Sequence, residues 1–398
     1  MSPVPRLRPY AGPALLSYGF RPFFLLGSIF AGCAVLAWLP AFYGELTIST
    51  AFVPRDWHVH EMIYGYAAAV VTGFLLTAVP NWTGRLPVQG GSLAVLLALW
   101  LGGRIAVLLS AHIGWAAAAA IDLAFLAGVA AVVAREIVAG RNWGNLKVLG
   151  VISVLMAGNL VFHLEAHVRG VADHGIRLGI AAVLMLIMIV GGRIIPSFTR
   201  NWLARENPGR LPAPFGRFDV ASLAIGAFAL VMWIVLPFAS VTAVALLVAA
   251  FAHAARLARW AGDRTLRDRL VVVLHAGYAF VPVGFLLVGL GALGIVAPSA
   301  GIHAWTVGAI GTMTLAVMTR ASLGHTGHEL KASWPTQTIY ALVLISATAR
   351  IVAALLPLSV DLLLHVAACA WAAAFLGFAL AFGRLLLSPR MVHKAVPA

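Results

Sequence analysis

Histidines inside apolar stretches are the residues of this sequence best suited to chemistry. The chain has 13 histidines, as many as its aspartates and glutamates together, among 398 residues. Neutral imidazole binds iron, copper or zinc without adding charge to apolar surroundings. A lone histidine of this kind is more often structural, but several at one end of different apolar stretches favour a metal or haem site. The candidate metal ligands at that end are His58, His60, His163 and His303, and His163 and His303 are also candidate ligands of a haem.

Glu61 adds an acidic group directly beside two of these histidines. His58 and Glu61 are three residues apart and share a face of a regular helix. His60 points elsewhere unless the backbone is irregular at this position. Because it adjoins the proposed ligands, we expect Glu61 to carry protons to the site as its catalytic residue.

Two further patterns place polar groups in apolar stretches. Asn159, His163 and His167 recur every four residues and form a polar stripe on one helix. Arg104 and Asp122 lie at equal depth on neighbouring apolar stretches, about 10–12 Å from the same end at 1.5 Å per residue. A charge buried in a membrane needs a partner, so we predict that Arg104 and Asp122 form an ion pair.

Four residues are candidates for contact with a separate cofactor or with its carboxylates. His275 and His325 lie at the opposite ends of their stretches, where a histidine taken alone is more often structural. Arg104 and Arg350 could neutralise haem propionates. For Arg104 this holds only if it does not already form an ion pair with Asp122.

The composition defines the elements that must position these residues. The chain is 62% hydrophobic and 10% charged, against about 25% charged in soluble domains. A membrane span needs about 20 apolar residues, so the sequence predicts an all-α polytopic membrane protein with one transmembrane domain over residues 1–398. The twelve predicted spans are 20–44, 57–80, 91–111, 114–135, 144–168, 174–198, 218–237, 239–259, 268–296, 302–322, 336–356 and 361–387.

The distribution of basic residues predicts the orientation. The net charge of +14 would suggest nucleic acid in a soluble chain, but cytoplasmic loops of membrane proteins collect Lys and Arg; we therefore expect no nucleic-acid partner. With the N-terminus in the cytoplasm, the even-numbered connections carry most of the basic residues, and both termini are predicted to be cytoplasmic. The basic residues on that side include Arg6, Arg8, Arg85, Arg141, Lys147, the stretch 200–217, the cluster 256–269 and Lys331.

Several of these segments resemble the NnrS family of bacterial inner-membrane proteins. The similarity runs from about residue 18 to residue 330, and its motifs occur in the family's order. One departure is His328, which follows His-Thr-Gly where the family has Arg. The segments that carry the resemblance are 20–24 (Phe-Arg-Pro-Phe-Phe), 57–62 (Trp-His-Val-His-Glu-Met), 73–84, 192–201, and 303–327, which ends in Gly-His-Thr-Gly.

The resemblance implies a twelve-span protein of the bacterial inner membrane that contains haem b and copper and takes part in nitric oxide metabolism. It implies His58, His60, His163, His275, His303 and His325 as the positions able to ligate metal. We therefore expect a haem–copper protein that binds nitric oxide and reduces or otherwise removes it, in the manner of a nitric oxide reductase. Reduction would also need an electron donor, which no motif identifies.

Two alternatives belong to other functional classes. The same histidines could bind metal transiently in a copper or small-molecule transporter, which broken helices near the membrane midplane would favour. They could also hold haem in a sensor or protective protein that binds nitric oxide without turning it over.

The predicted topology can be tested with reporter fusions. A reporter placed after Lys394 and another within residues 200–217 should both report the cytoplasm, because the basic residues concentrate on that side. A periplasmic signal from either fusion would contradict the predicted orientation.

Overall fold

The computed structural model describes residues 10–356 and 359–391, and every regular element in these ranges is helical. Twelve helical stretches are long and apolar enough to span a membrane, which confirms the predicted fold class and number of spans. The terminal residues on which the prediction of cytoplasmic ends depends, 1–9 and 392–398, lie outside the described ranges.

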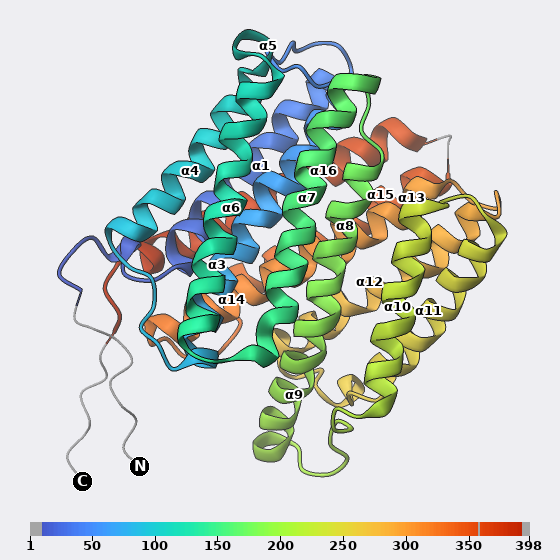
Figure 1. Ribbon diagram of the computed structural model, residues 1–398. Coiled ribbons are helices and arrows are strands. Elements are labelled where there is room, and N and C mark those ends of the chain that lie inside the picture. Colours follow the sequence, from blue (N-terminus) through green and yellow to red (C-terminus); the bar gives the residue numbers. More distant parts are fainter. Residues whose placement is uncertain (1–9, 357–358, 392–398) are drawn as a thin grey trace. The chain divides into compact units, whose positions relative to one another are not determined.

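Nine spans are single α-helices in their membrane part (Figure 1). They are α1 (Phe20–Phe42), α4 (Gly91–Leu108), α6 (Trp115–Ala139), α7 (Leu146–Arg169), α10 (Arg217–Val235), α11 (Ser240–Ala258), α12 (Arg269–Ala292), α15 (Trp334–Leu355) and α16 (Val360–Leu387). Short helical turns in the connections are η1 (Ala14–Leu16), α5 (Ser110–Ile113), η3 (Trp143–Asn145) and η5 (Gly262–Arg264).

The second, sixth and tenth spans each contain a π-helical segment. A π-helix has a wider turn than an α-helix, so it changes which side chains share a face. Proline at the first turn begins the second and tenth spans, and a left-handed glycine, Gly84 or Gly327, follows each of them. The three composite spans are α2–η2–α3 (Pro54–His60, Glu61–Ala67, Ala68–Thr83), α8–η4–α9 (His174–Leu186, Ile187–Gly191, Gly192–Glu206) and α13–η6–α14 (Pro298–His303, Ala304–Gly311, Thr312–Thr326).

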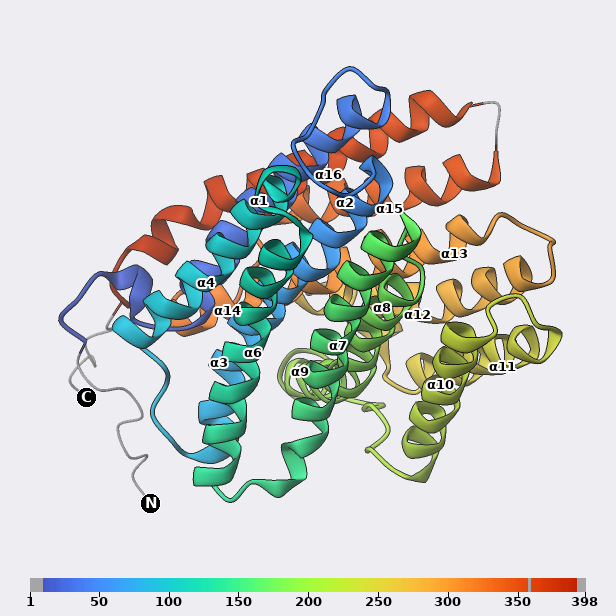
Figure 2. The same cartoon turned by 45° about the horizontal axis from the view of Figure 1, so that its top comes forward.

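The chain divides into two compact units, and each is built from separate segments of the sequence. The first unit comprises Met1–Gly179, Val317–Leu330 and Phe375–Ala398, and the second comprises Ile180–Ala316 and Lys331–Ala374. In the first unit α6 packs between α4 and α7, as Figures 1 and 2 both show. The expectation of one transmembrane domain stays a prediction.

Glycines permit close helix contacts in the first unit, next to the buried polar residues of its spans. A Cβ on Gly103 of α4 would lie 3.2 Å from Cα of Asp122 in α6, and one on Gly65 of η2 would lie 2.8 Å from Nη1 of Arg104. Small residues let membrane helices approach closely. Glycine at these positions therefore makes room for Arg104 to lie between the second and fourth spans.

The contact between α7 and α8 depends on Gly175. A Cβ there would lie 2.5 Å from the Cα of Phe162, which is backbone and cannot rotate away. We expect Gly175→Ala to destabilise the protein by about 1–3 kcal/mol, the usual cost of overpacking, measured as a lower melting temperature of the purified protein. Gly150→Ala, on the exposed side of α7 with no atom within 4 Å, is the matched control; equal melting of the two variants would contradict the proposed contact.

Candidate metal centre

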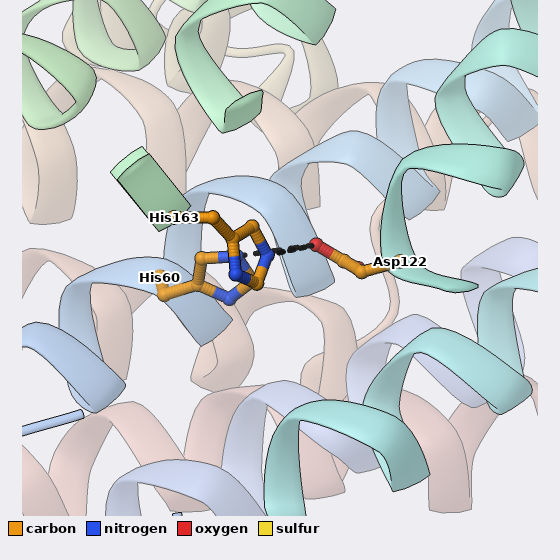
Figure 3. A group of neighbouring side chains, drawn as sticks. All are labelled: His60, Asp122 and His163. Atoms are coloured by element: carbon orange, nitrogen blue, oxygen red, sulfur yellow. Dashed lines mark hydrogen bonds and ion pairs between the residues drawn. The ribbon is translucent and has the colours of Figure 1, made fainter. Parts of the chain in front are cut away.

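Three buried side chains from three spans of the first unit converge on one point. Ligand atoms of His60 in α2, Asp122 in α6 and His163 in α7 all lie within 4.8 Å of one another. Nε2 of each histidine is 3.2 Å from Oδ2 of Asp122, and no side chain of the three is more than 1% exposed. Figure 3 shows both imidazole rings turned toward the carboxylate of Asp122.

His60 and Glu61 meet at the point where the second span changes from α-helix to π-helix. The π-helix begins at Glu61, directly after His60, and Oε1 of Glu61 lies 3.0 Å from Nδ1 of His60. The indole N–H of Trp100 donates to the carbonyl of Gly65 within the same segment, at 2.9 Å. The sequence placed His60 on a different helix face from Glu61 unless the backbone was irregular. The backbone is irregular at this position.

Arg104 binds two carboxylates at once, which confirms the predicted pair with Asp122. Its Nη2 donates to Oδ1 of Asp122 and its Nη1 donates to Oε1 of Glu61. All three side chains are at most 6% exposed. Arg104 was a candidate for contact with a haem propionate only if it was not paired with Asp122. Because the two residues are paired, that condition is not met.

Asn159 completes the surroundings of His60. Its amide N–H donates to Oδ2 of Asp122 at 2.8 Å, which leaves its Oδ1 facing Nε2 of His60 at 2.9 Å. Both ring nitrogens of His60 thus face oxygen acceptors. A metal-binding histidine typically directs its second ring nitrogen at a carboxylate in this way, and Glu61 is in that position.

The charges of this cluster do not sum to zero when the histidines are neutral. Arg104 contributes one positive charge, whereas Glu61 and Asp122 contribute two negative charges. An uncompensated charge is costly in a buried site within a membrane. One further positive charge would bring the sum to zero: a second proton on His60, whose ring nitrogens both face acceptors, or a Cu⁺ ion that replaces it.

The donor set also fits a transition metal. Bonds of 2.0–2.1 Å in a tetrahedral site separate neighbouring ligand atoms by about 3.3–3.4 Å, close to the two 3.2 Å separations on Asp122. Imidazole suits copper, zinc and iron. His60 and His163, with Asp122, are therefore the residues of the first unit that could hold copper.

One candidate ligand, His58, and one histidine of the polar stripe, His167, pack on tryptophan rings instead. His58 stacks on Trp38 of α1 with ring centroids 4.2 Å apart, and His167 stacks on Trp115 of α6 at 4.3 Å. Neither is among the three side chains that converge on the carboxylate of Asp122.

The other predicted site residues occupy different surroundings. His303, in the second unit, directs Nδ1 to the carbonyl of Ser299 at 2.6 Å, and His275 directs Nε2 to Oγ1 of Thr199 at 2.8 Å. His325, in the first unit, stacks on Tyr18 at 5.4 Å. Arg350 is half-buried in α15. The assignment of these four residues to a cofactor, and of His58 and His303 to the metal, stays a prediction.

The second unit contains a buried network that the sequence analysis missed. Arg256 donates to Oδ1 of Asp219 at 2.9 Å, to the carbonyl of Met188 at 2.9 Å and to the hydroxyl of Tyr278 at 3.0 Å. That hydroxyl is 2.8 Å from Nδ1 of His253. Arg256 was counted among the basic residues of a loop, yet its side chain is 0% exposed. Its position in the apolar run of α11 was the available signal.

The comparison with known families decides the identity of the chain. The family described as NnrS protein matches residues 14–390. The chain belongs to the NnrS family. None of the curated proteins matches it.

Membership of the NnrS family agrees with the twelve apolar spans and with the buried cluster. It makes the chain a multi-pass membrane protein associated with haem or metal and linked to nitric oxide. The cluster of His60, Asp122 and His163 is a group in the described structure that could hold a metal ion.

The ion pair at Arg104 can be tested with a double-mutant cycle. Arg104→Ala should cost about 3–5 kcal/mol, because it leaves Glu61 and Asp122 buried without their shared cation. Asp122→Ala should also destabilise the protein, but by less, because Arg104 keeps Glu61 as a partner. The measurement is the free energy of unfolding, or the yield of folded protein in membranes. The double variant should lose less than the sum of the two single losses; strictly additive losses would show that the residues do not stabilise each other.

Proposed function

We propose that this NnrS protein binds nitric oxide at a copper ion held by His60, His163 and Asp122, and removes it by reduction. The observation that carries the proposal is the convergence of two imidazoles on one buried carboxylate, with Glu61 against the second ring nitrogen of His60. Family membership supports the link to nitric oxide and to haem or metal.

The burial of the cluster suits this substrate. Nitric oxide is small and apolar, so it dissolves in the bilayer and can reach a site with no polar channel. Copper, when bound, would supply a coordination position and electron transfer. The protein's own groups would orient the ligands: Arg104 and Asn159 each donate a hydrogen bond to the carboxylate of Asp122.

Glu61 is the proposed proton carrier. Reduction of two molecules of nitric oxide to nitrous oxide and water consumes two electrons and two protons. Oε1 of Glu61 contacts both Nδ1 of His60 and Nη1 of Arg104. A proton arriving at Glu61 would therefore be one residue from the metal ligand, while Arg104 stabilises the carboxylate after the proton has left.

His303 is the proposed haem ligand. The hydrogen bond from its Nδ1 to the carbonyl of Ser299 places the ring proton on Nδ1, the tautomer in which Nε2 carries the lone pair that binds a metal. His275, whose Nε2 lies 2.8 Å from Oγ1 of Thr199, is the second candidate. Localisation in the bacterial inner membrane is part of the same proposal and rests on the family.

A resident cofactor fits the cluster better than transported metal. The donors are tied to Asn159, Glu61 and Arg104 by hydrogen bonds and are almost completely buried. A transport site would have to open and release its metal in each cycle. A transporter should also lack a stoichiometric Soret band in its optical spectrum, and a sensor should bind nitric oxide without consuming it in the presence of a reductant.

The proposal is tested by the metal and haem content of histidine variants. His60→Ala and His163→Ala should lower bound copper and abolish nitric oxide consumption, and His303→Ala should lower bound haem, while all three proteins stay in the membrane. Elemental analysis, the optical spectrum and a nitric oxide electrode give the three readouts.

His167→Ala is the matched control for the copper arm. His167 lies one turn from His163 on α7 but stacks on Trp115, so its loss should leave copper unchanged. Full copper in both His60→Ala and His163→Ala would mean that the cluster is structural.

A further inference from the structure

A cavity of about 340 Å³ lies in the first unit, at the opposite end of the spans from the metal cluster. Its lining comes from the start of α1, the end of α3, the end of α14 and the chain after α16. Asn81, which lines it, is 21 residues beyond His60 in the second span, or about 30 Å at 1.5 Å per residue. Charged, polar and aromatic residues of its lining include Arg21, Arg390, His325, Asn81, Gln89 and Tyr18.

Arg21 is a buried cation with no acidic partner among the described residues. It is 3% exposed, and its Nη1 donates to the carbonyls of Leu386 and Ser388 at 2.8 and 2.6 Å. No carboxylate lies within 4 Å of it in the part of the chain that the structure describes. The residues outside that part contain neither Asp nor Glu. Carbonyl dipoles do not cancel a full charge, and an uncompensated buried charge is costly.

The rest of the lining adds positive charge and hydrogen-bond donors. Arg390 lies at the exposed part of the cavity, and no Asp or Glu lines it. His325 stacks on Tyr18, and in the described structure neither of its ring nitrogens has a hydrogen-bond partner. Asn81 and Gln89 bring side-chain amides. Arginines in such a lining match the geometry and charge of phosphate.

The position of the cavity suits an anion from the membrane surface. The lining comes from the start of the first span and from the ends of the second, tenth and twelfth spans. Odd-numbered spans begin, and even-numbered spans end, on the same side of a membrane, so the whole lining lies on that side. Lipid phosphates lie at the depth of helix ends, and basic pockets of this kind on the cytoplasmic side bind phosphorylated headgroups.

We propose that this cavity binds a phosphate group, either the headgroup of an anionic phospholipid or a free phosphate compound. Arg21 supplies the buried charge, Arg390 closes the exposed side, and the imidazole of His325 and the two amides complete the contacts. The inference uses neither copper nor nitric oxide and stands independently of the proposed function.

The test measures the melting temperature of the full-length protein purified in a non-ionic detergent. One arm adds mixed micelles of phosphatidylglycerol, with phosphatidylcholine as the zwitterionic control. The other adds inorganic phosphate, with chloride at equal ionic strength as the control. Wild-type protein should melt at a higher temperature with phosphatidylglycerol, with phosphate or with both. A response to phosphatidylglycerol alone identifies a lipid, and a response to phosphate identifies a soluble ligand.

Variants connect the effect to the cavity. Arg390→Gln should weaken the apparent affinity for phosphatidylglycerol or phosphate about tenfold, which corresponds to the loss of one hydrogen bond to a charged group. Because Arg390 is exposed, this change does not endanger folding. Arg21→Gln should abolish the response and Arg21→Lys should retain part of it. Arg384→Gln, an exposed arginine of α16 that does not line the cavity, should respond like wild type.

Three results would overturn the proposal. One is that neither anion stabilises the wild-type protein more than its control. Another is that Arg384→Gln loses as much affinity as Arg390→Gln. The third is that Arg390→Gln loses its Soret band while phosphate and phosphatidylglycerol have no effect, which would assign the anion as a haem propionate.

Discussion

The arrangement of the first unit depends on the burial of one guanidinium. Arg104 lies in the apolar interior and is neutralised by Glu61 of the second span and Asp122 of the fourth. Breaking such a buried pair is far more costly than forming it is favourable, so the three spans have little freedom to shift relative to one another. Glycines 65 and 103 provide the space for the side chains. The imidazoles of His60 and His163 are then held against a carboxylate whose position is already fixed.

The π-helical turn of the second span begins beside the metal cluster. Oε1 of Glu61, the first residue of this turn, contacts both Nδ1 of His60 and Nη1 of Arg104. The indole N–H of Trp100 satisfies one carbonyl within the turn. π-helical segments also occur in the sixth and tenth spans. They therefore recur at every fourth span of this fold.

Two sites of the first unit carry opposite unbalanced charge. In the metal cluster two carboxylates exceed one arginine, and the imidazoles offer ligand atoms. In the cavity two arginines belong to a lining whose described residues include no carboxylate. Each imbalance is tolerable in an apolar surrounding only with a counter-charge. The first attracts a cation and the second attracts an anion, and these are the chemical classes assigned to them.

The sequence by itself determined the membrane class, the twelve spans, the NnrS family and the Arg104–Asp122 pair, because these depend on composition, span length, motifs and depth along a helix. Depth also placed His60 and His163 at one level. Tertiary structure decided which side chains meet. It packed His58 on Trp38 and His167 on Trp115, placed Glu61 against His60, and joined Arg256 to Asp219 and Tyr278. The physical reason is rotational: spacing gives a residue's height along its helix, whereas the face it presents depends on local winding and on how closely neighbouring spans approach.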